Sequence, residues 1–109
     1  MVATARRQRA TAPLEPTTPS RAAELLALLD TNPGASTEAQ CRRLVLAKEF
    51  TVLEAQRFLD IRHPPARVLN LRQDGHSIAD RWVRQTSERG HEHRTKLYTL
   101  LGLEGQVDA

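Results

Sequence analysis

The sequence has one cysteine, few aromatic residues and no long apolar run. Because Cys41 is the only cysteine, no disulfide can form within the chain, and a reducing compartment such as the cytoplasm is expected. The longest apolar run covers residues 25–29, far short of the roughly 18 residues that span a membrane, so no membrane contact is expected. Aromatic residues make up 4% of the chain, which predicts a thin core.

The charge balance is mildly basic. Lys and Arg number 16 against 13 Asp and Glu, which gives a formal net charge of +3. Lys48 and Lys96 are the only lysines, so arginine carries most of the positive charge, and its flat fork suits phosphates and guanine edges. This balance is compatible with nucleic-acid binding without establishing it. A chain of 109 residues allows one small domain with tails, which would gain stability from a partner or from dimerisation.

Residues 1–36 divide into an arm, a helix and a linker. Residues 1–19 are rich in Pro, Thr, Ala and Arg, and they are expected to form a disordered basic arm. Ser20 is the expected cap of a helix over residues 20–30, which ends at Asp30 and carries leucines on one face. A Thr-Asn-Pro-Gly break follows, so residues 20–36 are interpreted as an N-terminal helix and its linker.

Two capped helices are expected next. Thr37 and Gln40 have the spacing of a capping box, which predicts a helix that starts at Thr37 and turns its two adjacent arginines away from its apolar face. Thr51 and Glu54 fit the S/T-x-x-E pattern, in which each side chain satisfies an unpaired amide of the other residue. A further helix is therefore expected to start at Thr51 and to end by residues 60–62.

The segment HPPARVLNLRQDGH, residues 63–76, predicts a short helix with sharp ends. Pro64 suits a first helical turn, where its missing N–H would be unpaired, and Gly75 suits the position after the helix, where φ is positive. A helical wheel places apolar residues on the inner side, namely Pro64, Pro65, Val68 and Leu71. The opposite side is small or hydrogen-bonding and contains His63, Ala66, Arg67, Asn70 and Gln73.

This outer side has the chemistry of a DNA recognition helix. Ala66 allows a close approach, and Arg67 can bind a phosphate or the O6 and N7 edge of guanine. Asn70 and Gln73 can each pair with adenine. Any surface helix also has a polar outer face, so the pattern alone does not decide the function. The short connection to the preceding helix favours the DNA-binding interpretation, because a helix-turn-helix requires it.

After the glycine the pattern changes to the alternation of strands. Residues 77–86 and 94–101 predict a β-hairpin with a turn around Gly90. Trp82 and Tyr98 are expected to face the helices as part of the core, although both aromatic rings could also stack on bases. Basic residues on the strands and the tip form a flap that can follow a phosphate backbone: Arg81, Arg84, Arg89, Arg94 and Lys96.

From residue 37 to residue 101 the chain resembles a winged helix-turn-helix domain, similar to those of small phage and plasmid regulators. TVLEAQRFLDI is similar to the first helix of the motif, and ARVLNLRQDGHSI resembles the end of the recognition helix and its entry into the wing. Trp82 and LYTLL at residues 97–101 match wing strands that return to the core. The resemblance implies a mainly α fold with a small β-hairpin: a three-helix core and a two-stranded wing over residues 37–102, an extra N-terminal helix and a flexible tail over residues 103–109.

That resemblance implies sequence-specific binding of double-stranded DNA by a small transcriptional regulator of a phage or mobile element. Two other classes remain open: a winged-helix module that binds a host protein, and an architectural or packaging DNA-binding protein. A cytoplasmic homodimer is expected, associated with the nucleoid when bound, and the helix from Ser20 to Asp30 is its candidate contact. The residues expected to contact DNA lie on the helix-turn-helix and the wing: Thr51, Arg62, His63, Arg67, Asn70, Gln73, Arg84, Arg89 and Lys96.

Catalytic and metal chemistry are not expected. His91 and His93 lie two residues apart on one strand, but further ligands are missing nearby. Cys41, on a distant helix, is expected to be a small core residue. No Ser-His-Asp order, phosphate loop or pair of buried carboxylates stands out. The sequence therefore predicts no enzyme activity, no cofactor, no metal and no small-molecule substrate.

Overall fold

The computed structural model describes residues 12–87 and 89–103, which form four helices and four strands. The helices are α2 (Pro19–Thr31), α3 (Thr37–Ala47), α4 (Val52–Phe58) and α5 (Pro64–Gln73). The strands are β1 (Ala12–Leu14), β2 (Glu49–Thr51), β3 (His76–Thr86) and β4 (Glu92–Leu103). None of these helices is long and apolar enough to cross a membrane.

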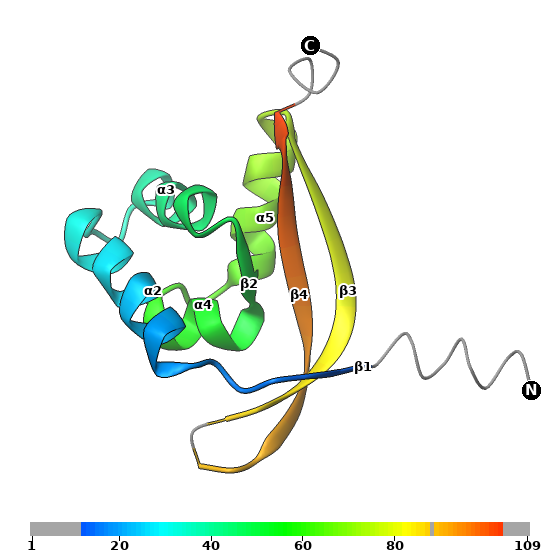
Figure 1. Ribbon diagram of the computed structural model, residues 1–109. Helices are drawn as coiled ribbons and strands as arrows, with labels where there is room; N and C mark the ends of the chain where they lie inside the picture. Colours follow the sequence, from blue (N-terminus) through cyan, green and yellow to red (C-terminus); the bar gives the residue numbers. More distant parts are fainter. Residues whose placement is uncertain (1–11, 88, 104–109) are drawn as a thin grey trace, which may run out of the picture.

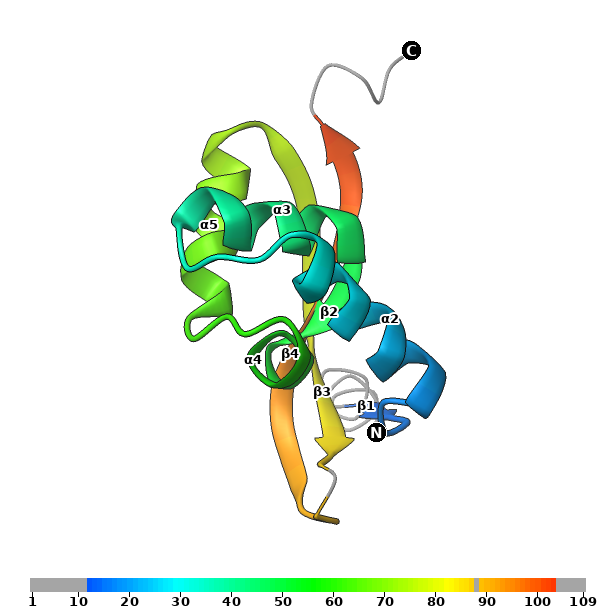
Figure 2. The same cartoon turned by 90° about the vertical axis from the view of Figure 1, so that its left-hand side faces the viewer.

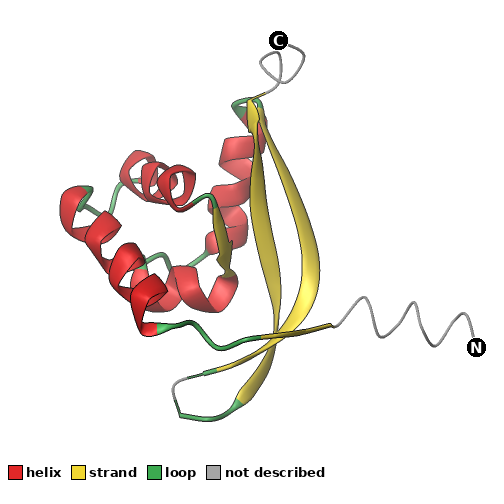
Figure 3. Cartoon of the chain, in the orientation of Figure 1, coloured by secondary structure: helices red, strands yellow, loops and turns green. Residues whose placement is uncertain are grey.

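The strands form one mixed sheet in the order β1-β3-β4-β2. β3 and β4 pair antiparallel along their whole length, with an irregularity between Ser77 and Ile78. β2 is antiparallel to β4, and β1 is parallel to β3. The far end of the hairpin extends beyond the helices (Figure 1), and the four helices lie on one side of the long strands (Figure 3).

The expected fold class is confirmed in its main parts and corrected in the sheet. α3, α4 and α5 form the three-helix core, α2 is the extra helix, and β3 and β4 form the hairpin. The sheet is larger than a two-stranded wing, because β2 joins one edge and β1 joins the other. Both added strands have three residues, too few to show an alternating pattern, and both pair with residues far away along the chain.

The expected disordered arm over residues 1–19 is corrected where the structure describes it. Ala12–Leu14 forms β1, and its parallel pairing with β3 fixes the start of the described chain against the wing. Residues 1–11 lie outside the described residues. At the other end, Leu103 belongs to β4, and the rest of the expected tail, residues 104–109, also lies outside the description.

The first two helices are capped one residue or more before the predicted caps. Thr18, not Ser20, caps α2: its hydroxyl accepts the backbone N–H of Arg21 at 3.1 Å. Ser36, not Thr37, caps α3 in the same way, and its hydroxyl oxygen lies 3.1 Å from the backbone nitrogen of Ala39. In both cases the capping residue lies one or two positions before the predicted one, and its backbone is extended, as a cap requires.

The core lies between the helices and the inner side of the sheet. α2 contributes Leu25, which has no exposed surface, and Leu28 packs against the same cluster. The leucine face proposed as a dimer contact is therefore used inside the monomer. Leu26 points elsewhere and is exposed. Other buried members of the cluster come from every part of the core: Leu44, Phe50, Leu59, Ile61, Val68, Leu71, Ile78 and Tyr98.

Arg43 lies inside the molecule, although the sequence pattern placed it on the outer side of α3. It is 0% exposed, and its Nε donates to the carbonyl oxygen of Leu59 at 2.9 Å. Its Nη1 donates to the carbonyl oxygens of Asn32 at 2.7 Å and Gly34 at 3.0 Å. Burial lowers the pKa of Arg43, and Asp60 opposes this effect by raising it. One guanidinium thus joins the loop before α3 to the end of α4.

Candidate nucleic-acid interface

The ends of α5 follow from the residues that the sequence singled out. Pro64 occupies the first turn, and His63 precedes it without a side-chain cap bond. Gly75 has φ of +101°, a conformation that glycine adopts at no steric cost, and it ends the helix as predicted. Val68 and Leu71 are buried together with Pro64 and hold α5 on the core.

The exposed arc of α5 is displaced from the predicted outer face, and an apolar residue lies near its middle. His63 and Gln73 are exposed, as expected. Pro65 is exposed rather than buried, which corrects its predicted place on the inner side. Leu69 is 56% exposed and lies near the middle of the exposed arc, four residues after Pro65 and four before Gln73.

Arg67 and Asn70 lie at the margin of this arc, half-buried toward the helical core. Figure 2 shows α5 beside α3, and the Arg67 Nη1 donates to the Thr37 hydroxyl of that helix at 3.2 Å. The Arg67 Nε and the Asn70 Oδ1 are buried without a hydrogen-bond partner among the residues that the structure describes. These two residues therefore do not project freely from the helix, as the sequence pattern suggested.

Arg72 has a structural role that sequence reasoning missed. Its Nη2 donates to the carbonyl oxygen of Ile78 at 2.6 Å and to the Asp80 Oδ2 at 3.0 Å. These bonds fasten the last turn of α5 to the start of β3. Asp80, eight residues after Arg72, was the available signal in the sequence. Spacing alone does not show that a residue on a helix pairs with a residue on the following strand.

The two candidate phosphate contacts of the turn differ in exposure. Arg62 is exposed in the connection before α5, where a phosphate can reach it. Thr51 is 0% exposed, so its predicted phosphate contact is wrong. Its hydroxyl is used twice inside the protein: it accepts the Glu54 N–H at 3.1 Å and donates to the Gln85 Oε1 at 2.6 Å. The predicted capping box of Thr51 and Glu54 is confirmed.

The basic residues of the wing are exposed or half-exposed, and acidic neighbours offset some of their charge. Arg84 is exposed, and its Nη1 lies 3.9 Å from the Glu92 Oε1 on the partner strand. The Lys96 Nζ lies 3.9 Å from the Asp80 Oδ1. Arg89 is exposed in the turn between the strands. Such exposed pairs are weak, so these cations remain able to exchange a carboxylate for a phosphate.

The elements follow the order α3-β2-α4-α5-β3-β4, and a short turn joins α4 to α5. A comparison with protein families agrees with this arrangement. Residues 39–102, more than half of the chain, match the family described as winged helix-turn-helix domain. The chain belongs to this family. Searches of curated proteins and of solved structures found no match.

Within the winged helix-turn-helix, α4 and α5 are the two helices of the motif, and β3 and β4 form the wing. The second helix of a helix-turn-helix enters the major groove of DNA, and here that helix is α5. Membership of the family thus indicates binding of double-stranded DNA.

Trp82 lies on the outside of the winged helix-turn-helix wing, so its predicted place in the core is wrong. It is 40% exposed, and the Arg94 guanidinium carbon lies 4.6 Å from the centre of its ring. The Lys96 Nζ lies 5.3 Å from the same centre. Tyr98, by contrast, is buried as predicted, and its ring centre lies 5.7 Å from that of Phe50. Two cations beside an indole face are an attractive arrangement even in water.

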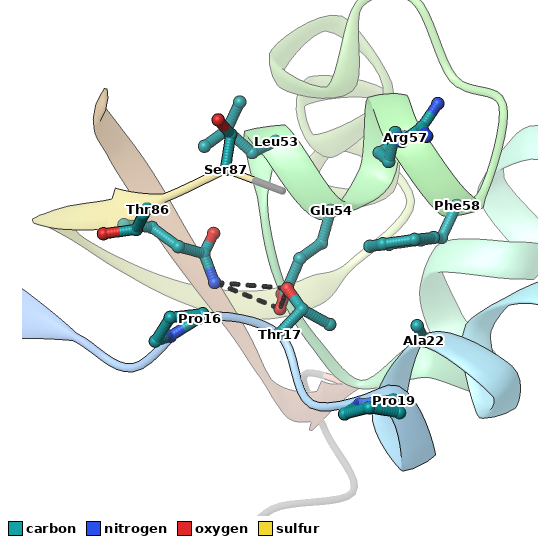
Figure 4. Close-up of a pocket in the computed structure, with 11 residues that line it drawn as sticks. Pro16, Thr17, Pro19, Ala22, Leu53, Glu54, Arg57, Phe58, Thr86 and Ser87 are labelled. Atoms are coloured by element: carbon teal, nitrogen blue, oxygen red, sulfur yellow. Dashed lines mark hydrogen bonds between the residues drawn. The ribbon is translucent and has the colours of Figure 1, made fainter. Parts of the chain in front are cut away.

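A buried polar network connects the N-terminal segment, α4 and the wing. The Glu54 Oε2 accepts the Thr17 hydroxyl at 2.6 Å and the Gln85 Nε2 at 3.3 Å. Figure 4 shows Thr17 and Glu54 meeting beside a cavity of about 390 Å³ that lies between these three segments. Gln85 is 2% exposed on β3, so the network sets the position of the wing relative to the helix-turn-helix motif.

Cys41, on α3, contacts the backbone of α5. The Cys41 thiol is half-buried, and its Sγ donates weakly to the Arg67 carbonyl oxygen at 3.9 Å. Burial raises the pKa of this thiol, Arg67 lowers it and Asp74 raises it. Among residues 12–87 and 89–103, no three His, Cys, Asp or Glu side chains converge where a metal ion could sit.

Proposed function

We propose that this protein is a sequence-specific regulator of transcription that binds double-stranded DNA and has no catalytic activity of its own. The observation that carries the proposal is the outer arc of α5, which is open to solvent on a winged helix-turn-helix scaffold. Residues 62–73 contain no acidic side chain, so nothing on this helix repels the phosphates that flank a major groove. The resemblance to small phage and plasmid regulators supports a mobile element as the source and the cytoplasm as the place of action.

The exposed residues divide between base edges and the DNA backbone. His63 and Gln73 lie on the exposed arc of α5 and are placed to donate to base edges. Arg62 precedes the helix and meets a phosphate, while Arg84, Arg89 and Lys96 contact the backbone from the wing. Arg67 and Asn70 contribute from the margin, where an edge of the groove can reach their exposed atoms.

A homodimer forms part of the proposal, because paired recognition helices bind inverted half-sites about one helical turn apart. Leu25 and Leu28 are used in the monomer core, so the dimer contact uses another surface. An enriched inverted repeat in the target DNA, together with the molecular mass of the free protein, tests this part of the proposal.

The deciding experiment is a selection from random duplex DNA at about 150 mM salt, where non-specific binding is suppressed. We expect an enriched motif and, for a protein touching about five phosphates, a log–log salt slope of about −4 to −5. Arg89→Ala should weaken binding to all sequences equally and make the slope less negative by about one. Arg42→Ala removes an exposed arginine of α3, outside the helix-turn-helix and the wing, and serves as the control.

A flat selection with a slope near zero would contradict the proposal. It would favour a winged-helix module that binds another protein. Strong binding and bending of DNA without sequence enrichment would instead favour an architectural role. An effect of Arg89→Ala on one sequence only would contradict the assignment of Arg89 to a phosphate.

A further inference from the structure

Leu69 is an exposed apolar side chain near the middle of the arc that a recognition helix turns toward the groove. Leu69 is 56% exposed, while the apolar anchors of the same helix, Val68 and Leu71, are almost fully buried. Leu69 is therefore not needed to attach α5 to the core. A single exposed leucine on an ordinary surface needs no explanation, but this one occupies the middle of the arc that faces a ligand.

The residues around Leu69 leave room for close approach. Pro65 and Ala66 lie one turn before it, and Gln73 lies one turn after it. The first two are compact and apolar, and Arg72, whose Nη2 donates to Ile78 and Asp80, borders the arc on its other side. The hydrogen-bonding groups of Arg67 and Asn70 lie at the side toward the core, with their Nε and Oδ1 atoms buried.

The major groove offers one apolar group to such a surface, the 5-methyl group of thymine. The charge of the surroundings also fits DNA. Arg62 and His63 are exposed at the start of α5, and no acidic residue occurs between positions 62 and 73. A second protein fits less well, because an interface needs about 800 Å² of complementary surface per partner, far more than one leucine and its small neighbours supply.

We propose that Leu69 contacts a thymine methyl group in the major groove, so that the DNA targets of this protein contain thymine at one fixed position. This inference rests on the proposed function and adds the chemistry by which it chooses a sequence. Gln73, one turn further along the helix, hydrogen-bonds the base at a neighbouring position, where a glutamine side chain suits adenine. Methyl recognition of this kind distinguishes thymine from uracil, which have the same Watson–Crick edge.

The test replaces each thymine of the selected site in turn by deoxyuridine, which removes only the methyl group. Dissociation constants are measured by fluorescence anisotropy with the full chain at about 150 mM salt. We expect binding to weaken about fourfold at one position per half-site, the factor that corresponds to burying one methyl-sized group, and to be unchanged at the others.

Two leucine variants connect the effect to α5. Leu69→Ala should bind the thymine and deoxyuridine duplexes equally well, because the contact that distinguishes them is gone. Leu46→Ala is the matched control: Leu46 is 47% exposed on α3, away from the recognition helix, and its loss should leave the fourfold difference intact. Circular dichroism and thermal unfolding of both variants verify that their folds are retained.

The other outcomes separate this inference from the proposed function. If no duplex is enriched in the selection, the proposed function fails and the inference fails with it. If a motif is enriched but deoxyuridine has no effect at any position, the methyl contact is overturned and the function stands. A Leu69→Ala variant that keeps the fourfold difference, or that loses self-association instead of methyl discrimination, also overturns the inference.

Discussion

Replacing Arg43 by methionine is expected to destabilise the protein by about 3 kcal/mol. Methionine keeps a long stem in the same space but leaves three carbonyl oxygens without their donor, those of Leu59, Asn32 and Gly34. An unsatisfied buried acceptor costs about 1–3 kcal/mol. The bond to Leu59 is fully buried, whereas the other two are partly buried, so water can serve their carbonyls at a lower cost.

The opposing contribution comes from the charge itself. Burial lowers the pKa of Arg43, which means that the cation is costly to hold inside the molecule, and methionine removes that cost. A net loss of about 3 kcal/mol is a large part of the 5–15 kcal/mol that stabilises a typical domain. It exceeds the effect of most surface substitutions, which stay within about 0.5 kcal/mol.

Urea unfolding of the full chain, followed by circular dichroism, measures this difference. With a slope of about 1.5 kcal/mol per molar urea, the midpoint of Arg43→Met should fall by about 2 M. The neighbouring Arg42 gives a matched control. Its Nη2 lies 3.0 Å from the Glu38 Oε1 on the exposed side of α3, and such a pair contributes about 0.5 kcal/mol or less. Equal, small shifts for Arg42→Met and Arg43→Met would refute the assignment of stability to the buried guanidinium.

Three further predictions concern the cap, the titrating groups and the tryptophan. Thr51→Ala removes the α4 cap and the buried bond to Gln85 and should cost about 2 kcal/mol in urea unfolding. Thr37→Ala removes no cap and only the exposed bond from the Arg67 Nη1, so it should cost much less; the reverse order would contradict the cap assignment. Burial raises the pKa values of Cys41 and Tyr98 above their ordinary values of 9.0 and 10.0, so both groups ionise more readily in the unfolded chain. The stability they contribute is present below pH 9 and is lost as the pH rises further, and urea midpoints that stay constant between pH 8 and pH 10.5 would be inconsistent with this. Trp82, the only tryptophan, should be quenched by acrylamide in the folded protein, and a shielded, blue-shifted emission would place it in the core after all.

The parts of the fold that the sequence predicts well depend on local signals. Pro64 and Gly75 mark the two ends of α5. Proline restricts the allowed backbone angles and glycine broadens their range, and neither effect depends on distant contacts. The Thr51–Glu54 box works for the same reason, since both partners lie within one turn. The resemblance to a winged helix-turn-helix domain is confirmed by the family match over residues 39–102.

The parts that the sequence did not predict depend on distant partners. The bonds of Arg43 go to backbone carbonyls of two separate loops, and carbonyls carry no sequence signal. β1 and β2 exist because longer strands offer free edges beside them, not because three residues prefer an extended backbone.

The position of Trp82 shows why strict alternation of buried and exposed side chains is a poor prediction for a twisted hairpin. A strict period of two places Trp82 on the same face as the buried Ile78, and Val83 on the opposite face. The structure buries Val83 and Gln85 instead, so the covered face changes between the start and the end of β3. The hairpin twists along its length. Near its base, the helices therefore cover the strand face that carries Ile78. Further along, Thr51 and Glu54 hydrogen-bond to Gln85, which lies on the alternate face of β3.

The helical wheel of α5 placed Arg67 and Asn70 on the outer side, and this prediction was wrong for a related reason. A wheel with one apolar flank assumes one neighbour, but α5 packs against α3, α4 and β3. Several neighbours bury a wide arc and turn the side chains at its edge inward, so the exposed strip of α5 runs through Pro65, Leu69, Arg72 and Gln73. Because Arg67 already donates to Thr37, the proposed function assigns the choice of sequence mainly to the exposed residues His63, Leu69 and Gln73.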